Sequence, residues 1–485
     1  MNSNKNKKFY ITSSIAYTNA PPHIGFALEV IQADVLARYH RLLGEDVFFL
    51  TGTDEHGIKN FRAAKRAQKA PQEFINEIAA KFKELTKILN ISNNDFIRTT
   101  DQKKHWPGVR KAWLMLKNKG DIYKKKYKGF YCVGCEAFIT KKDLVGGKCS
   151  IHQKKPELIE EENYFFKLSK YSKKIEKVIK KDELKIIPNS RKNEVLSFIK
   201  TGIKDISFSR PKKHLKWGIP VPDDETQLIY VWSDALVNYI SALGYAQNSS
   251  KFERFWPADI HCVGKDIIRF HAVIWPGILF SLGLTLPRII LVHGFITSSG
   301  QKMSKSLGNV VDPFELVEKY STDAVRYFLL REIPPTKDGD FTEEKFETRY
   351  NSDLAAGIGN LVSRVVTMAA KSNPKPQIPN FKQTSNPKFQ TKIDKIRKNY
   401  KQSLENFKFN EALIFIWELI SFCDKYIEKE RPWENKENQK QVISDLLLTI
   451  KEIAKLLEPF LPETSEKISK QLDELQTGKP LFPRI

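Results

Sequence analysis

The sequence predicts an α/β chain in which a parallel-sheet domain with a short Cys/His insertion precedes an all-α domain. Three observations predict it: strand-like and helical stretches alternate in the first half, a segment rich in Cys, His and Gly interrupts them at residues 130–155, and strand signals end near residue 346. Alternating strands and helices are typical of parallel sheets, because parallel strands need crossover connections. The length of 485 residues is enough for roughly three domains.

The first half supplies the strand–helix–strand pattern. Apolar, β-prone runs that predict buried strands lie at residues 9–16, 46–51, 227–232 and 289–293. A turn over residues 18–22 leads into helical periodicity from His23, and a second helical stretch covers residues 59–89. Strands and helices in this order are expected to build one parallel sheet.

Helical periodicity dominates the second part, from about residue 346 to 475. Two breaks divide it, a Pro-rich stretch at residues 372–388 and the tripeptide Arg431-Pro432-Trp433. This pattern predicts a separate helical bundle, and residues 477–485 are expected to form an extended tail.

Composition and charge narrow the class of protein. With 41% apolar and 28% charged residues, the chain is expected to be globular and not disordered. The net charge of +23 favours a polyanionic partner such as nucleic acid, although Lys-rich solvated helices would give the same excess. The five cysteines are few for a disulfide framework, and the longest uncharged run, residues 272–287, is shorter than a membrane span. A cytoplasmic protein without membrane contact is predicted.

Four residues in the insertion have the spacing of metal ligands. Cys132-x-x-Cys135 and Cys149-x-x-His152 form two knuckles that suit one closed, tetrahedral Zn²⁺ site. With all four positions filled by protein, this zinc is expected to be structural. A redox-active dithiol is the alternative. Cys262 and Cys423 have no such neighbours and are expected to be ordinary buried cysteines.

Two motifs favour phosphate binding. Pro22-His23-Ile24-Gly25 lies where a strand leads into a helix, so backbone N–H groups and an imidazole can face an anion there. Gln301-Lys302-Met303-Ser304-Lys305-Ser306 places two lysines and two serines in a loop, which can hold a triphosphate. The first motif is weak by itself and the second could be a surface loop, but the pair in this order is specific.

The two motifs resemble the two signatures of class I aminoacyl-tRNA synthetases, and other segments are similar to methionyl-tRNA synthetases in particular. Those segments are Tyr17–Ala20, Phe49–Gly57, Tyr230–Ala235, and Gly264–Ile267 running to Phe270-His271. The resemblance covers about residues 8–475. It implies a Rossmann-type catalytic domain whose first half is residues 1–115 and whose second half is 226–290, a connective insertion with the zinc knuckle at 116–225, a lysine-loop and stem-contact region at 291–345, and a helical anticodon-binding domain at 346–485.

The resemblance also implies a reaction and the residues that perform it. Methionine would be attached to tRNA(Met) through a methionyl-adenylate. ATP would be consumed, Mg²⁺ would accompany the ATP, and the 2′-OH of the terminal ribose would be the acceptor. The implied catalytic residues are His23, Lys302 and Lys305, which with Gly25 and Ser304 would bind ATP. The implied methionine-binding residues are Ile15, Tyr17, Asp54, Trp232, Tyr239, Ile267 and His271. The residues implied to read the anticodon are Asn360, Arg364 and Trp433.

The sequence departs from the family pattern at two places, and two alternatives to a methionine enzyme stay open. The first signature normally ends in His and here ends in Phe26, which leaves a weakened or non-catalytic tRNA-binding paralogue as one alternative. The intact lysine loop argues against it. Another class I synthetase, for leucine, isoleucine, valine or cysteine, is the second alternative. The first three usually carry a large editing insertion, and a cysteine enzyme would need a thiol-ligating zinc in its substrate pocket. The chain also ends near the end of the helical domain, without the module that many relatives use to dimerise, so a monomer is expected.

Without the resemblance, the two anticodon candidates have ordinary structural alternatives: Asn360 could start a helix and Trp433 could be a core residue.

Overall fold

The computed structural model describes residues 7–134, 137–139, 143–151, 153–303, 308–372, 386–434, 436–476 and 478–485. The chain divides into two compact units. The first contains residues 1–22, 40–87 and 92–293, and the second contains residues 23–39, 88–91 and 294–485. Among the described residues, no helix combines the length and the apolar character that a membrane span requires.

The first unit contains a seven-stranded parallel sheet with the order β10–β16–β15–β1–β3–β2, and β4 pairs with β3. Its strands are β1 (Lys8–Ser13), β2 (Ala16–Tyr17), β3 (Asp46–Asp54), β4 (Asp95–Arg98), β10 (Lys185–Ile187), β15 (Ile260–Gly264) and β16 (Ile289–His293). Every pairing in this sheet is parallel, as in the register Tyr10↔Phe48 between β1 and β3. The parallel α/β sheet predicted from the sequence is confirmed.

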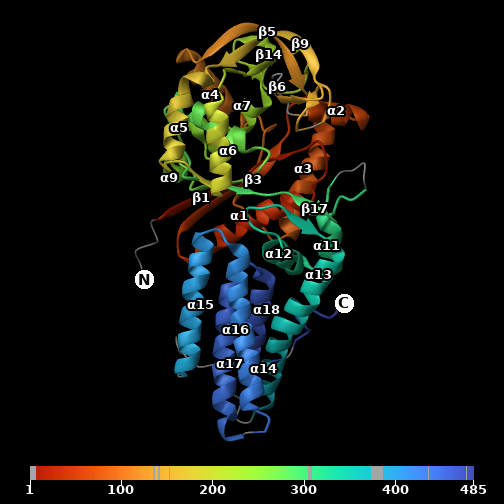
Figure 1. Cartoon of the computed structure of the whole chain (residues 1–485), viewed down its shortest axis with the longest axis vertical. Helices are drawn as coiled ribbons and strands as arrows, with labels where there is room; N and C mark the ends of the chain where they lie inside the picture. Colours follow the sequence, from red (N-terminus) through yellow and green to blue (C-terminus); the bar gives the residue numbers. More distant parts are fainter. Residues whose placement is uncertain are drawn as a thin grey trace. The chain divides into compact units, whose positions relative to one another are not determined.

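Helices pack around this sheet (Figure 1). They are α2 (Ile58–Arg66), α3 (Pro71–Ile88), α4 (Trp106–Asn118), α5 (Ser172–Lys180), α6 (Asn189–Lys200), α7 (Val231–Ala235), α8 (Asn238–Ser241), α9 (Ser250–Phe255) and α10 (Trp275–Leu282). The stretch predicted as one helix over residues 59–89 is two helices, because Gln68 adopts a left-handed φ of 55° between them. The strand predicted over 227–232 is also wrong at its end: β14 (Asp224–Ile229) stops earlier, and Trp232 lies on α7.

Apart from β10, which joins the parallel sheet, the strands of the connective insertion pair in antiparallel sheets. One sheet has the order β11–β9–β5–β6, a second β12–β14–β13, and β7 pairs with β8. The bounds are β5 (Ile122–Cys132), β6 (Ala137–Ile139), β7 (Leu144–Val145), β8 (Lys148–Cys149), β9 (Glu157–Phe166), β11 (Ile206–Ser207), β12 (Ser209–Pro211) and β13 (Pro220–Val221). Basic β5 faces acidic β9 in the register Lys126↔Glu162 and Lys128↔Glu160, so the two charge runs neutralise each other across the pair.

The second unit is mostly helical, as predicted. Its elements are the strands β17 (Ile296–Ser298), β18 (Gln301–Lys302) and β19 (Gly339–Phe341), and the helices α11 (Pro313–Tyr320), α12 (Thr322–Arg331), α13 (Glu343–Arg349), α14 (Asn360–Lys371), α15 (Pro387–Glu405), α16 (Phe409–Glu430), α17 (Lys436–Leu457) and α18 (Pro462–Glu474), with a π-helix over Tyr350–Gly359. Figure 1 shows α14 to α18 running side by side as a bundle. Buried residues at helical spacing on α16, from Leu413 through Ile416 and Ile420 to Ile427, form its core-facing stripe.

Helix α1 (Ile24–Leu42) begins as the crossover after β2, yet most of its residues belong to the second unit. One link between α1 and the rest of that unit is a fully buried ion pair in which Arg326 Nη2 lies 2.8 Å from Asp34 Oδ2. The Arg326 guanidinium also donates to the carbonyl oxygens of Leu89, Pro459 and Phe460. Its donors are thus satisfied, which a buried charge requires.

Candidate active site

Residues predicted to bind methionine lie at the carboxyl edge of the parallel sheet. Ile15 follows the end of β1, Asp54 ends β3, and Ile267 follows the end of β15. In parallel α/β sheets, ligands bind outside the carboxyl ends of the strands, where the connecting loops can hold them. Tyr17 pairs in register with Asp54 across β2 and β3, and Lys59 Nζ lies 5.3 Å from the centre of the Tyr17 ring.

The segment that carries Asp54 is fixed by hydrogen bonds on its main chain and on its neighbour. Asp54 is 4% exposed, and its carbonyl oxygen accepts from Thr18 N at 3.1 Å and Asn60 Nδ2 at 3.1 Å. The Glu55 carboxylate accepts from Arg98 Nε at 2.7 Å and Nη2 at 3.1 Å. These hydrogen bonds hold the backbone from which the Asp54 side chain extends.

Aromatic and imidazole rings form the apolar part of the candidate site. Trp232 stacks on Phe270 with ring centres 3.5 Å apart and planes 9° from parallel. The Tyr239 hydroxyl lies 2.7 Å from His271 Nε2, and His271 Nδ1 lies 3.0 Å from the carbonyl oxygen of Ile267. Because a carbonyl only accepts, Nδ1 carries the ring proton and Nε2 accepts from Tyr239. Both side chains are almost fully buried, so the hydrogen-bonded pair is a fixed part of the wall.

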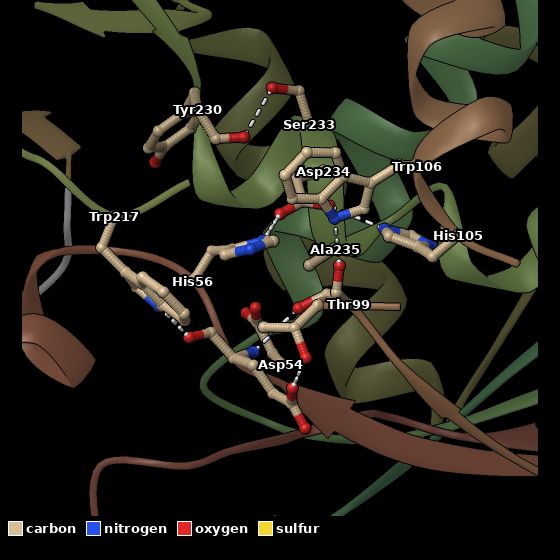
Figure 2. Close-up of polar contacts among 12 residues, drawn as sticks. Asp54, His56, Thr99, His105, Trp106, Trp217, Tyr230, Ser233, Asp234 and Ala235 are labelled. Atoms are coloured by element: carbon tan, nitrogen blue, oxygen red, sulfur yellow. Dashed lines mark hydrogen bonds and ion pairs between the residues drawn. The ribbon is translucent and has the colours of Figure 1, made fainter. Parts of the chain in front are cut away.

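Sequence reasoning missed a buried polar network beside these residues, shown in Figure 2. Asp234 Oδ2 lies 2.6 Å from His56 Nδ1, and Asp234 Oδ1 lies 2.7 Å from His105 Nε2. Trp217 Nε1 donates to the carbonyl oxygen of Glu55 at 2.7 Å. His56 and Asp234 stand inside segments that carried the family resemblance, which was the available signal, whereas His105 had none.

The first phosphate motif belongs to the second unit. His23 is exposed, and the Gly25 N–H donates to His23 Nδ1 at 3.0 Å, so a neutral imidazole carries its proton on Nε2 and can donate it to an anion. A Cβ on Gly25 would come within 2.8 Å of the His23 ring, so a larger residue there would displace this ring from its present position. Phe26 is 8% exposed. Lys302 ends β18 and is exposed, while Ser304 and Lys305 lie outside the described residues.

The residues predicted to read an anticodon lie on the helical bundle. Asn360 and Arg364 are one turn apart on α14, and Arg364 Nη2 lies 2.7 Å from Glu428 Oε1 on α16. Trp433, between α16 and α17, is 48% exposed. That exposure rules out a core role for Trp433, and Asn360 continues the preceding π-helix instead of capping a new helix.

Two of the four predicted zinc ligands are described. Cys132 at the end of β5 and Cys149 at the end of β8 are both buried, in a small cluster with Ile139. Cys135 and His152 lie outside the described residues. Cys262 and Cys423 are buried, as predicted.

Comparisons with known proteins agree with this arrangement. Residues 9–147 and 139–366 match tRNA synthetases class I (M), and residues 388–481 match the anticodon-binding domain of tRNA ligase. The methionine–tRNA ligases of Thermotoga maritima and Clostridium acetobutylicum are 43% and 45% identical, over 96% and 98% of this chain and 75% of each relative. A solved structure of Mycobacterium tuberculosis methionyl-tRNA synthetase in complex with methionyl-adenylate has a TM-score of 0.92 at 37% identity, covering 99% of this chain and 100% of that one. The chain therefore belongs to the methionine type of the class I tRNA synthetases.

Proposed function

We propose that this chain is a methionine–tRNA ligase, which activates methionine with ATP and transfers it to tRNA(Met). The observation that carries the proposal is the carboxyl edge of the sheet, where a buried carboxylate, Asp54, and the ring walls of Trp232 and Tyr239 lie in one unit. A carboxylate complements an ammonium group, and aromatic rings complement a thioether. Relatives named methionine–tRNA ligase over nearly the whole chain support this over other class I synthetases.

In the first step, the methionine carboxylate attacks the α-phosphorus of ATP. A new oxygen–phosphorus bond forms, the bond to the β-phosphate oxygen breaks, and pyrophosphate leaves. The attacking carboxylate is already anionic, so no general base is needed, and the protein contributes positioning and charge stabilisation. Asp54 would hold the ammonium, while His23 Nε2, Lys302 and Lys305 would stabilise the phosphates. Mg²⁺ would arrive with ATP.

In the second step, a hydroxyl of the terminal tRNA ribose attacks the adenylate carbonyl and AMP leaves. The helical bundle would select the tRNA, with Trp433 stacking on an anticodon base and Asn360 and Arg364 donating to base edges. The exposure of Trp433 supports this role, because a stacking side chain must be accessible. The same proposal includes the division of the chain into two catalytic halves at residues 1–115 and 226–290, a connective insertion at 116–225, a lysine-loop and stem-contact region at 291–345, and an anticodon-binding domain at 346–485.

The proposal includes one structural zinc ion held by Cys132, Cys135, Cys149 and His152. Support comes from the donor chemistry, since the two buried thiols at the ends of β5 and β8 belong to one small cluster of buried residues. A zinc with four protein ligands stabilises the fold around it and leaves no position for substrate. We further propose a monomer that works in the cytoplasm. The net charge of +23 favours separation of copies, and sedimentation velocity tests that state.

Methionine-dependent exchange of ATP with labelled pyrophosphate tests the first step, and charging of a tRNA(Met) transcript tests the second. Exchange with methionine but not with leucine, isoleucine, valine or cysteine is expected. Exchange with a different amino acid would reassign the substrate, and tRNA binding without any exchange would identify a non-catalytic paralogue.

A further inference from the structure

A buried carboxylate, Asp234, connects three segments that are distant in the sequence. His56 lies 178 residues before it and His105 lies 129 residues before it. The side chains of Asp234, His56 and His105 are 1%, 4% and 0% exposed. Isolating a charged group from water is unfavourable unless strong partners compensate, and here each carboxylate oxygen has one imidazole N–H. Burial alone would raise the pKa of Asp234, but the charge of His56 and the hydrogen bonds from both rings bring it below its usual value.

The hydrogen bonds of this network have defined directions. A carboxylate only accepts, so His56 donates from Nδ1 and His105 donates from Nε2 (Figure 2). His105 Nδ1 then accepts from the Ser241 hydroxyl at 2.8 Å, which anchors the network to α8. The His56 ring is further confined by Trp106 and Trp217, whose ring centres lie 6.1 and 5.7 Å away.

The network joins the two halves of the candidate methionine site. His56 is two residues after Asp54, and Asp234 is two residues after Trp232 on the same short helix α7. A single 2.6 Å hydrogen bond therefore ties the segment proposed to hold the ammonium to the segment proposed to contact the thioether. We propose that Asp234 is a positioning residue that fixes the spacing between Asp54 and Trp232, and with it the affinity for methionine. This inference rests on the proposed function.

Two substitutions at this position separate geometry from folding. Asp234→Ala removes both hydrogen bonds. Asp234→Asn keeps the shape but offers one acceptor and one donor, so one imidazole must change its tautomer. His105 can do so, because the Ser241 hydroxyl can accept as well as donate. Asp234→Asn should therefore retain much of the spacing that Asp234→Ala loses.

The matched control is Asp121→Asn in the same unit. Asp121 is 0% exposed and accepts from Lys170 Nζ at 2.6 Å and Ser281 Oγ at 2.6 Å, away from the proposed methionine residues. The Asp121→Asn variant therefore shows how the loss of a buried, hydrogen-bonded carboxylate affects folding alone.

The experiment measures the Kd of methionine by calorimetry, the KM of methionine and of ATP in pyrophosphate exchange, and the melting temperature. Asp234→Ala should raise the Kd and KM of methionine by about 10- to 100-fold, with the KM of ATP unchanged. Asp234→Asn should show a smaller rise, and Asp121→Asn should lower only the melting temperature. Unchanged methionine affinity in Asp234→Ala, or parallel increases in the KM of both substrates, would overturn the inference. If Asp234→Ala does not fold, wild-type affinity in folded Asp234→Asn overturns it. A wild-type chain that binds no methionine would instead overturn the proposed function.

Discussion

Replacement of Asp54 by Asn should weaken methionine binding without disturbing the fold. Asp54 is 4% exposed, and its main-chain oxygen accepts hydrogen bonds from Thr18 and Asn60 that Asn would keep. Two unit charges about 4 Å apart interact by about 4 kcal/mol at an effective dielectric constant of about 20. Removing one partner of a buried charge pair costs about 2–5 kcal/mol. A loss of about 2–4 kcal/mol corresponds to a Kd raised roughly thirty- to several-hundred-fold.

A comparison of two ligands tests the cause of that loss. The deaminated analogue of methionine keeps the thioether and the carboxylate but has no ammonium, so Asp54→Asn should leave its Kd unchanged or lower it. Calorimetry on both ligands and both proteins completes a thermodynamic cycle that isolates the ammonium–carboxylate interaction. Asp259→Asn is the control, because Asp259 is 6% exposed and precedes β15, at the opposite edge of the sheet. Equal weakening of both ligands would show that Asp54 acts through the fold and would refute this reasoning.

Four further predictions follow from the structure. Trp433→Ala should lower tRNA charging roughly ten- to a hundred-fold while pyrophosphate exchange stays unchanged, because loss of base stacking costs about 1–3 kcal/mol; equal losses in both assays would contradict it. Burial raises the pKa of Asp323 to about 6, so the folded chain binds this proton more tightly than the unfolded chain. The protonated side chain should therefore add about 2–3 kcal/mol to the free energy of unfolding below about pH 4. This contribution should be lost as the pH rises through 6. Urea unfolding across this range checks it, and Asp323→Asn should lack that dependence. Metal analysis should find about one zinc per chain, and Cys149→Ser should lose both the metal and stability of the insertion. Phe26→His should leave exchange unchanged or raise it, whereas Lys305→Ala should lower it by at least about 10².

The sheet and the bundle were predictable because their signals are local. Strand β16 has the bounds predicted for it, and strand signals end where the long helices begin. The end of β14 was mispredicted because Tyr230-Val231-Trp232 is as apolar as a strand. The Tyr230 carbonyl oxygen instead accepts from Ser233 Oγ at 2.7 Å and Asp234 N at 3.0 Å, which starts helix α7. Side-chain bonding of this kind competes with strand formation.

Long-range pairing was not predictable in the same way. The Lys-rich run around Lys126 was compatible with a solvated helix, but in the fold it lies on strand β5 and faces the acidic run around Glu162. Asp34 on α1 pairs both with Arg38, one turn along the helix, and with Arg326, almost 300 residues later, and no local pattern could indicate the second pairing. The candidate site shows the same difference between local and long-range signals. Motifs pointed to the residues proposed to touch substrate, whereas His105, which supports them from another segment, lies in no motif.

The burial of Phe26 bears on how phosphate charge is stabilised. At 8% exposure, a phenyl ring gains from leaving water, whereas an imidazole in the same place would need a hydrogen-bond partner to offset its desolvation. Phe26 therefore contributes packing to α1 and cannot donate to a phosphate. The donor proposed for that role, His23, is exposed, and its bond from the Gly25 N–H directs the ring proton to Nε2. Phosphate stabilisation would then depend on His23 and the two lysines of the loop, which is why a lysine substitution is expected to cost far more than any change at Phe26.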